Sequence, residues 1–216
     1  MPLAQKTITD QNMLEWQQFL KTGTCLENKV RPEILASWKR CLKLGIDPYN
    51  NAKHSSLDSK KMTEALAKNK DFLDIARPFM ANLYKIVAGS GFVVVLTDAS
   101  GYILELFADK DHPVINSITA NFFPGACWSE AVAGTNAIGT TMVQKEPLQV
   151  NGSEHYCYKH HLLTCSAAPI SDADGNLIGI LAISGVAVAA HTHTLGMAVA
   201  AAASIMAQMS ILGKNR

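Results

Sequence analysis

The spacing of apolar side chains divides this chain into a helical first part and a strand-rich second part. Up to residue 87, apolar residues recur every three to four positions, which is the period of an amphipathic helix. Capping residues, Pro and Gly predict the ends of three helices: from a cap at Thr9 or Asp10 to Gly23, from Pro32 to Gly45, and from Leu57 to Val87. Because Pro78 lies inside the third helix, we expect a kink there or a break at Arg77.

The hydrophobic period changes after the Gly-Ser-Gly sequence at 89–91. The β-branched run Phe92–Thr97 and the apolar run Tyr102–Phe107 flank turn residues, which predicts a hairpin. The remaining expected elements are short strands at Ile138–Val143, Leu148–Val150, Leu162–Ile170 and Leu177–Ser184, and a last helix over Ala189–Leu212. This order predicts an α+β domain with an antiparallel sheet of about five to six strands, flanked by N- and C-terminal helices.

A polar stretch separates the first two helices from the rest of the chain. Residues 46–56 contain one Pro, two Asn and two Ser, a composition typical of a linker. We therefore expect a helical leader over residues 1–56 and a separate domain over residues 57–216. The last helix is rich in Ala, at 198 and 200–203, which permits close approach of a neighbouring helix. Helices at both ends of the second domain favour pairing of two copies in a homodimer.

The composition is that of a globular protein without a strongly charged surface. Hydrophobic residues make up 48% of the 216 residues, enough for a core, and the formal net charge is +1. Since neither half is strongly basic, we do not expect this segment to bind nucleic acid. Five cysteines without a CxxC spacing indicate a reduced protein. The first residues lack a signal-peptide pattern. The apolar tract at 187–209 is rich in the weakly apolar Ala and is broken by His191, His193 and Gln208, so we expect a cytoplasmic protein without a membrane span.

The segment from Gly125 to Gly185 contains the candidate chemistry. It combines a short element around Trp128, a loop rich in His and Tyr, and two apolar strands joined by an Asp-Gly turn. Apolar and aromatic walls with a few polar groups are typical of a small-molecule pocket, so we predict that these parts line one. The predicted ligand contacts are Phe123, Trp128, Glu130, Asn136, His155, Tyr156, Tyr158 and Cys165.

Several of these candidates also have a purely structural interpretation. Trp128 can be a core residue, and Asn136 can cap a helix or form a turn. Glu130 can accept a hydrogen bond at a helix start, which is the interpretation that we favour for it. Free cysteines usually pack as small hydrophobic residues, so Cys165 is either a core residue or a thiol in the pocket wall.

Two sharper hypotheses concern the same segment. Aromatic rings converging near a carboxylate could form a cage for a quaternary ammonium ion, with each cation–π contact worth about 0.5–2 kcal/mol. The residues His155, Cys157, His160, His161 and Cys165 have side chains that suit zinc or iron. Their spacing is not that of a standard zinc module, so no metal or cofactor is expected.

The motifs SWKRCLKLGIDP, LTDASGYIL, WSEAVAGTNAIGT, EHY and CSAAPISDADGNLIGILAISG occur in this order along the chain. Together they resemble the sensory region of bacterial sigma-54-dependent, enhancer-binding transcription activators, a family that includes regulators of acetoin catabolism and of dihydroxyacetone-kinase operons. The resemblance covers about Arg31 to Gly185. It implies a GAF-type sensory domain that precedes an AAA+ ATPase and a helix-turn-helix module.

The resemblance implies a binding module, not an enzyme. Its effector could be a quaternary amine, acetoin or a polyol, and closure of the segment Phe122–His161 would shift the helices at 57–87 and 189–212. Because these residues lack a GxxxxGK[ST] loop, contact with sigma-54 RNA polymerase and DNA would require modules outside them. Alternatives are a GAF-fold thiol enzyme such as a free methionine sulfoxide reductase, which would use Cys127, Cys157 or Cys165; a metal or redox sensor; or a dimerisation domain without a ligand.

Overall fold

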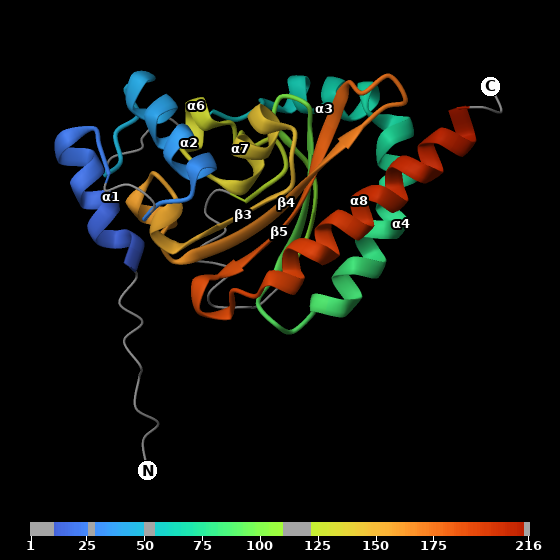
Figure 1. Cartoon of the computed structure of the whole chain (residues 1–216). Helices are drawn as coiled ribbons and strands as arrows, with labels where there is room; N and C mark the ends of the chain where they lie inside the picture. Colours follow the sequence, from blue (N-terminus) through green and yellow to red (C-terminus); the bar gives the residue numbers. More distant parts are fainter. Residues whose placement is uncertain (1–10, 26–28, 50–54, 110–121, 214–216) are drawn as a thin grey trace, which may run out of the picture.

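The computed structural model describes residues 11–25, 29–49, 55–109 and 122–213. It contains a five-stranded sheet in the order β2-β1-β5-β4-β3, with helices on both faces (Figure 1). All neighbouring strands are antiparallel. The predicted α+β class and the antiparallel sheet are therefore confirmed. The helix cap expected at Thr9 or Asp10 lies outside the described residues.

The strands follow the predicted apolar runs closely. Their bounds are Val93–Asp98 for β1, Ile103–Phe107 for β2, Leu148–Asn151 for β3, Leu163–Ser171 for β4 and Leu177–Val186 for β5. The hairpin β1–β2 is closed by an Asx-type turn, in which the Asp98 carboxylate accepts from the backbone N–H groups of Ser100 and Tyr102. The long strands β4 and β5 pair over nine positions, so they form the centre of the sheet together with β1.

One face of the sheet is covered by the leader and by two short helices. These are α1 (Gln11–Thr22), α2 (Pro32–Lys43), α6 (Glu130–Ala133) and α7 (Ala137–Gln144). The buried side chains of Trp16 and Trp38 belong to the same hydrophobic cluster as Val95, Cys165 and Ala182 of the sheet. The division into a leader over 1–56 and a domain over 57–216 stays a prediction, but the leader helices share the core of the sheet.

The opposite face of the sheet packs against two long helices. Helix α4 (Lys70–Val87) lies against β1 and β2, while α8 (Thr192–Gly213) lies against β4 and β5, and the two helices contact each other. The shorter α3 (Ser59–Lys68) precedes α4, and a 3-10 turn, η4 (Ala187–Ala189), leads from β5 into α8. Figure 1 shows α4 and α8 together on the side of the sheet away from α1 and α2.

The predicted helix over Leu57–Val87 is two helices. Of the two alternatives expected from Pro78, the break at Arg77 is wrong, and the kink stays a prediction. The break lies at Asn69, whose side-chain amide donates to the Ala65 carbonyl at 2.9 Å and ends α3. Helix α4 then continues through Pro78. An Asn can satisfy a helix end with its own side chain, and this local capping chemistry sets the boundary here.

The strand expected at Ile138–Val143 is also wrong, because these residues form helix α7. Their β-branched side chains favour a strand, but Asn136 caps the segment by accepting from the Gly139 N–H at 2.9 Å. The N-cap and the tertiary contacts of α7 with β4 and β5 override the local preference.

Helix α8 is rich in apolar residues and has no Asp, Glu, Lys or Arg. By length and composition alone, its residues Thr192–Leu212 could cross a membrane, which is weak evidence because core helices pass the same test. In the structure the helix packs on β4, β5 and α4, with Ala198, Ala202 and Ile205 buried in that contact.

Candidate functional site

Helix α2 is joined to the Trp128 element through a buried carboxylate. Glu130, at the start of α6, accepts two hydrogen bonds from Arg40, at 2.7 and 2.8 Å. The hydroxyls of Ser37 and Thr140 donate to its Oε1 at 2.5 and 2.8 Å. Since these donors satisfy both oxygens of the carboxylate, Glu130 connects the leader to α6 and α7, as the structural interpretation of this residue expects.

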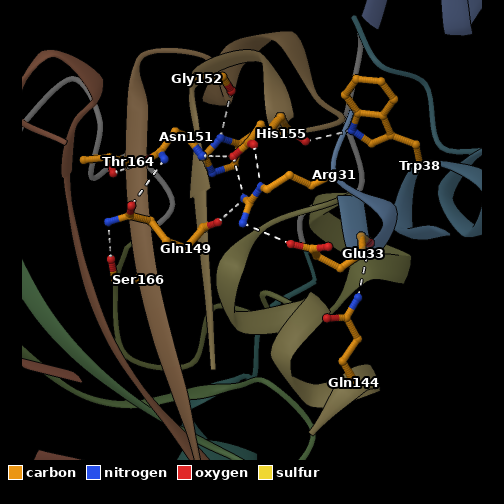
Figure 2. A network of polar contacts seen from close by, with 11 residues as sticks. Arg31, Glu33, Trp38, Gln144, Gln149, Asn151, Gly152, His155, Thr164 and Ser166 are labelled. Atoms are coloured by element: carbon orange, nitrogen blue, oxygen red, sulfur yellow. Dashed lines mark hydrogen bonds and ion pairs between the residues drawn. The ribbon is translucent and has the colours of Figure 1, made fainter. Parts of the chain in front are cut away.

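A second buried carboxylate connects the leader to the loop that follows β3. Glu154, in the 3-10 turn η2 (Gly152–Glu154), accepts from Arg31 Nε and Nη2 at 2.9 and 2.8 Å. It also accepts from the Asn151 backbone N–H, which completes a capping box. Figure 2 shows Arg31 reaching from the start of α2 towards this turn, with Glu33 on its other side.

The backbone from Glu154 to Tyr156 is held at three successive carbonyl groups. The indole N–H of Trp38 donates to the Glu154 carbonyl at 2.7 Å, and that of Trp16 donates to the Tyr156 carbonyl at 2.9 Å. Between them, the Nε2 of His161 is 3.0 Å from the His155 carbonyl. A carbonyl oxygen only accepts, so this nitrogen carries a proton. The loop is therefore held by two indole donors from the leader and by one imidazole of its own.

The imidazole of His155 is completely buried. Its Nδ1 lies 3.0 Å from the Gly152 carbonyl oxygen, while its Nε2 has no hydrogen-bond partner among the described residues. Burial lowers the pKa of His155 to about 4, so the ring is neutral at pH 7. A buried polar atom without a partner is rare in proteins and calls for an explanation such as a water or a ligand.

A row of rings connects His155 with the Trp128 element. The ring centroids of His155 and His160 are 6.0 Å apart, and those of His160 and Trp128 are 5.1 Å apart. Trp128 in turn stacks on Phe122 at 4.2 Å. All four side chains are buried. The row brings together the loop after β3 and the segment before α6, and a pocket lined by these residues stays a prediction.

Asn136 has a structural role in the Trp128 element. Besides capping α7, its side-chain amide donates to the carbonyls of Trp128 and Gly134 at 2.9 and 2.8 Å. These bonds occupy both amide hydrogens and the carbonyl oxygen of the side chain. The residue therefore shapes the backbone around Trp128, and a direct ligand contact by it stays a prediction.

The sheet offers a floor of small side chains on the same side. Cys165 lies opposite Ser184, and Ala167 lies opposite Ala182, in the register of β4 and β5. Burial raises the pKa of the Cys165 thiol to about 12, so the thiol is protonated at neutral pH. Cys165, Ala167 and Ala182 belong to the same buried cluster as Trp128 and Tyr156.

The structure separates the eight predicted site residues into two groups. Phe123 and Tyr158 are exposed, at 43% and 55%. The others are buried: Trp128, Glu130, Asn136, His155, Tyr156 and Cys165. Ligand contact by any of the eight stays a prediction. Four residues that contact the site elements were not among those predicted from the sequence: Trp16, Arg31, Ser37 and Arg40. The SWKR motif contains Ser37 and Arg40, but a motif does not identify the distant partners of its residues.

Two further observations concern a groove outside the candidate site and the arrangement of metal-ligating side chains. A half-open groove of about 670 Å³ lies elsewhere, between the β4–β5 turn and the second half of α8, and none of the predicted site residues lines it. Within the described ranges, no three His, Cys, Asp or Glu side chains converge as metal ligands. The His and Cys side chains of the loop after β3 are thus not assembled as a metal centre there.

Residues 7–207 match the family described as the MimR N-terminal domain. Over 203 residues the chain is 37% identical to the acetoin dehydrogenase operon transcriptional activator AcoR of Bacillus subtilis, covering 93% of this chain and 33% of that protein. Over 157 residues it is 28% identical to the propane 2-monooxygenase operon transcriptional activator MimR of Mycolicibacterium goodii, covering 72% of this chain and 26% of that protein. The chain thus spans a third or less of these relatives.

Among solved structures, the crystal structure of the E. coli DhaR(N)–DhaL complex resembles this chain with a TM-score of 0.80. The match covers 86% of this chain and 64% of that chain at 18% identity. At this identity the likeness shows the fold alone. The shared architecture is the GAF-like one, an antiparallel sheet with flanking helices.

Proposed function

The chain belongs to the family of the MimR N-terminal domain, and on that basis we propose that it senses a small effector for a transcriptional activator of an operon. The observation that carries the proposal is the match over residues 7–207 to a family whose named members activate operons. The activator is cytoplasmic. In this proposal, the activator acts on DNA and on sigma-54 RNA polymerase through modules like those that would make up the unmatched part of the relatives.

The effector site in this proposal is the buried row of rings from Phe122 to His155. Its outer wall is the loop that Trp16, Arg31 and Trp38 hold in place. An effector that changes the position of this loop also changes the contacts of α1 and α2. On the sheet side, β5 leads directly through η4 into α8. Occupancy can thus reach both the leader and the last helix, provided that the effector binds one arrangement better than the other.

Charges around the site favour an uncharged effector. The buried carboxylates in the described part of the chain are Glu15, Glu130 and Glu154, and each has a cationic partner: Lys29, Arg40 and Arg31. In a cage for a quaternary amine, a carboxylate without a cationic partner would add charge attraction to the cation–π contacts, and these three carboxylates are already neutralised. Of the candidates from the sequence, acetoin or a polyol therefore suits the site better than a quaternary amine.

The thiol of Cys165 does not favour the alternative of a thiol enzyme. Cys165 is one of the three cysteines that this alternative would use, and burial raises its pKa to about 12. The thiolate is the nucleophilic form of cysteine, so burial disfavours the reactive form of this side chain at neutral pH. The Bacillus subtilis and Mycolicibacterium goodii relatives are also named as transcriptional activators.

The exposed face of α8 supports the homodimer. It carries the small side chains Gly196, Ala200, Ala203 and Ala207 beside Val199, and none of its residues is charged. In the proposed dimer, this face packs on its counterpart in a second copy. Small side chains allow the two helix backbones to approach closely.

Introducing a charge on α8 tests the dimer. Val199→Arg should convert a dimer into a monomer, because the guanidinium would be buried without a partner between the helices. Val143→Arg is the matched control, since Val143 on α7 is 53% exposed and faces away from this surface, whereas Val199 is 38% exposed. Light scattering during size-exclusion chromatography measures the mass. A monomeric wild-type chain, or a dimer that survives Val199→Arg, would contradict the proposed interface.

A chimeric activator tests the sensory function. This chain replaces the matched N-terminal third of the Bacillus subtilis activator, and a reporter gene is measured with acetoin, glycerol, propane-1,2-diol, propan-2-ol or betaine, of which only betaine lacks a hydroxyl group. We expect at least one compound to change transcription by about tenfold or more, a coupling of about 1.4 kcal/mol. Deletion of the chain should abolish the response. Equal transcription with every compound, with the chimera folded and expressed, would count against a sensory role.

A further inference from the structure

The hydrogen bond of His155 identifies which ring nitrogen carries its proton. Its Nδ1 is 3.0 Å from the Gly152 carbonyl, which can only accept, so Nδ1 is the protonated nitrogen of the neutral ring. The other nitrogen, Nε2, then presents a lone pair and can only accept a hydrogen bond. No described residue donates to it, and the imidazole is fully buried.

We propose that His155 Nε2 accepts a hydrogen bond from a hydroxyl group of the effector, and that the effector is a small uncharged alcohol. The inference rests on the proposed sensory function and adds the class of the ligand and the atom that selects it. A buried acceptor without a donor is unfavourable. A ligand hydroxyl removes that penalty, whereas an ether or a carbonyl oxygen, which only accepts, leaves it in place.

The surroundings of His155 hold its ring ready for such a contact. The carbonyls of residues 154, 155 and 156 each receive a ring N–H, from Trp38, His161 and Trp16. The Gly152 carbonyl accepts from the backbone N–H of His155 as well as from Nδ1. With both the backbone and one ring nitrogen held, the direction of the Nε2 lone pair is set before the ligand binds. Preorganisation of this kind favours selectivity over adaptability.

The same surroundings exclude charged ligands. The buried carboxylates that could attract a cation already pair with Arg40, Arg31 and Lys29. The neutral imidazole supplies no positive charge for an anion, because burial keeps the pKa of His155 at about 4. The adjoining rings of His160, Trp128 and Phe122 offer flat, largely apolar surfaces to a short carbon skeleton.

The test compares alcohols with their methyl ethers by isothermal titration calorimetry on the whole 216-residue chain. The probe pairs are acetoin against 3-methoxybutan-2-one and propan-2-ol against 2-methoxypropane, with acetate and tetramethylammonium as charged probes. We expect the wild-type chain to bind at least one alcohol about tenfold or more tightly than its ether. His155→Phe should remove that preference, and His191→Phe, at an exposed His outside the site, should keep it.

A second measurement does not depend on the folding of a variant. In the wild-type chain, ¹⁵N NMR of labelled histidine should show His155 protonated at Nδ1 and not at Nε2. A proton on Nε2 would overturn the proposal, because that nitrogen would then be a donor. Equal binding of alcohols and ethers, or an alcohol preference that persists in folded His155→Phe, would overturn it as well.

The outcomes distinguish this inference from the sensory function on which it rests. The proposal that the effector is an alcohol is wrong if acetate or tetramethylammonium binds most tightly, or if the chimera responds only to a compound without a hydroxyl group. The sensory function is not contradicted by either result. If none of the calorimetric probes binds and the chimera responds to nothing, both proposals are wrong. Alcohol-selective binding without any response of the chimera supports the site and contradicts its role in transcription.

Discussion

Replacing Arg40 by methionine should lower the free energy of unfolding by about 3 kcal/mol, because it leaves the Glu130 carboxylate buried without a counter-charge. Glu130 is almost completely buried. The Arg40 guanidinium donates two hydrogen bonds to its carboxylate, at 2.7 and 2.8 Å. The Arg40 side chain is itself 34% exposed, so we place the effect at the low end of the range for buried pairs. Urea unfolding followed by tryptophan fluorescence measures it.

Two controls separate the charge from the loss of side-chain packing. In Arg40→Met combined with Glu130→Gln, the remaining hydrogen bonds from Ser37 and Thr140 meet a neutral amide, so most of the stability should return. Arg77→Met removes an exposed guanidinium that pairs with Asp74 and Glu105, and should change stability by less than about 1 kcal/mol. An Arg40→Met variant as stable as Arg77→Met would show that the buried pair contributes little.

The ion pair at Glu130 illustrates what a sequence pattern can and cannot predict. The motif SWKR and the motif WSEAVAGTN are both recognisable, and Glu130 at a helix start is a reasonable structural interpretation. Its partner Arg40 lies 90 residues earlier. Periodicity reports local structure, so it cannot identify a partner at that distance. The same limit applies to Arg31 with Glu154, which are 123 residues apart.

The strands were predictable because turn chemistry delimits them. Asp98–Gly101 and Asp172–Gly175 mark the β1–β2 and β4–β5 connections, and the apolar runs between these turns leave little choice of register. Helix α7 was not predictable by the same reasoning. A short apolar, β-branched run fits the pattern of a strand as well as that of a buried helix. There, the Asn136 cap and the packing of α7 on the sheet decide the structure.

The candidate site was predictable as a region but not as an arrangement. The density of His and Tyr after β3 pointed to residues 155–161, yet the sequence does not distinguish the buried His155 from the exposed Tyr158. The distinction follows from the leader, whose two indole N–H groups bind the carbonyls on either side of His155. The segment that was expected to form a separate leader thus supplies part of the framework of the site.

Replacing Gly139 by alanine should lower the free energy of unfolding by about 2–3 kcal/mol, as expected for overpacking. Gly139 lies inside α7, where alanine would normally stabilise a helix by about 1 kcal/mol. A Cβ at this position would lie only 2.6 Å from the Glu130 nitrogen and 2.7 Å from the Trp128 carbonyl oxygen. Both are backbone atoms, so neither can rotate away, and the crossing of α7 over the start of α6 must open instead.

Gly196→Ala is the matched substitution, since Gly196 also lies in a helix, α8, and its added Cβ meets nothing within 4 Å. Both substitutions are made in the Val199→Arg background, which removes the proposed dimer contact of α8. There Gly196→Ala should raise the free energy of unfolding by about 0.5–1 kcal/mol, whereas Gly139→Ala should lower it, although helix propensity favours alanine at both positions. Thermal and urea unfolding at one protein concentration measure both. If Gly139→Ala were as stable as Gly196→Ala, α7 could not be packed this closely on the Trp128 element. The rigid backbone around Trp128, on which the proposed effector site depends, would then lack its main support.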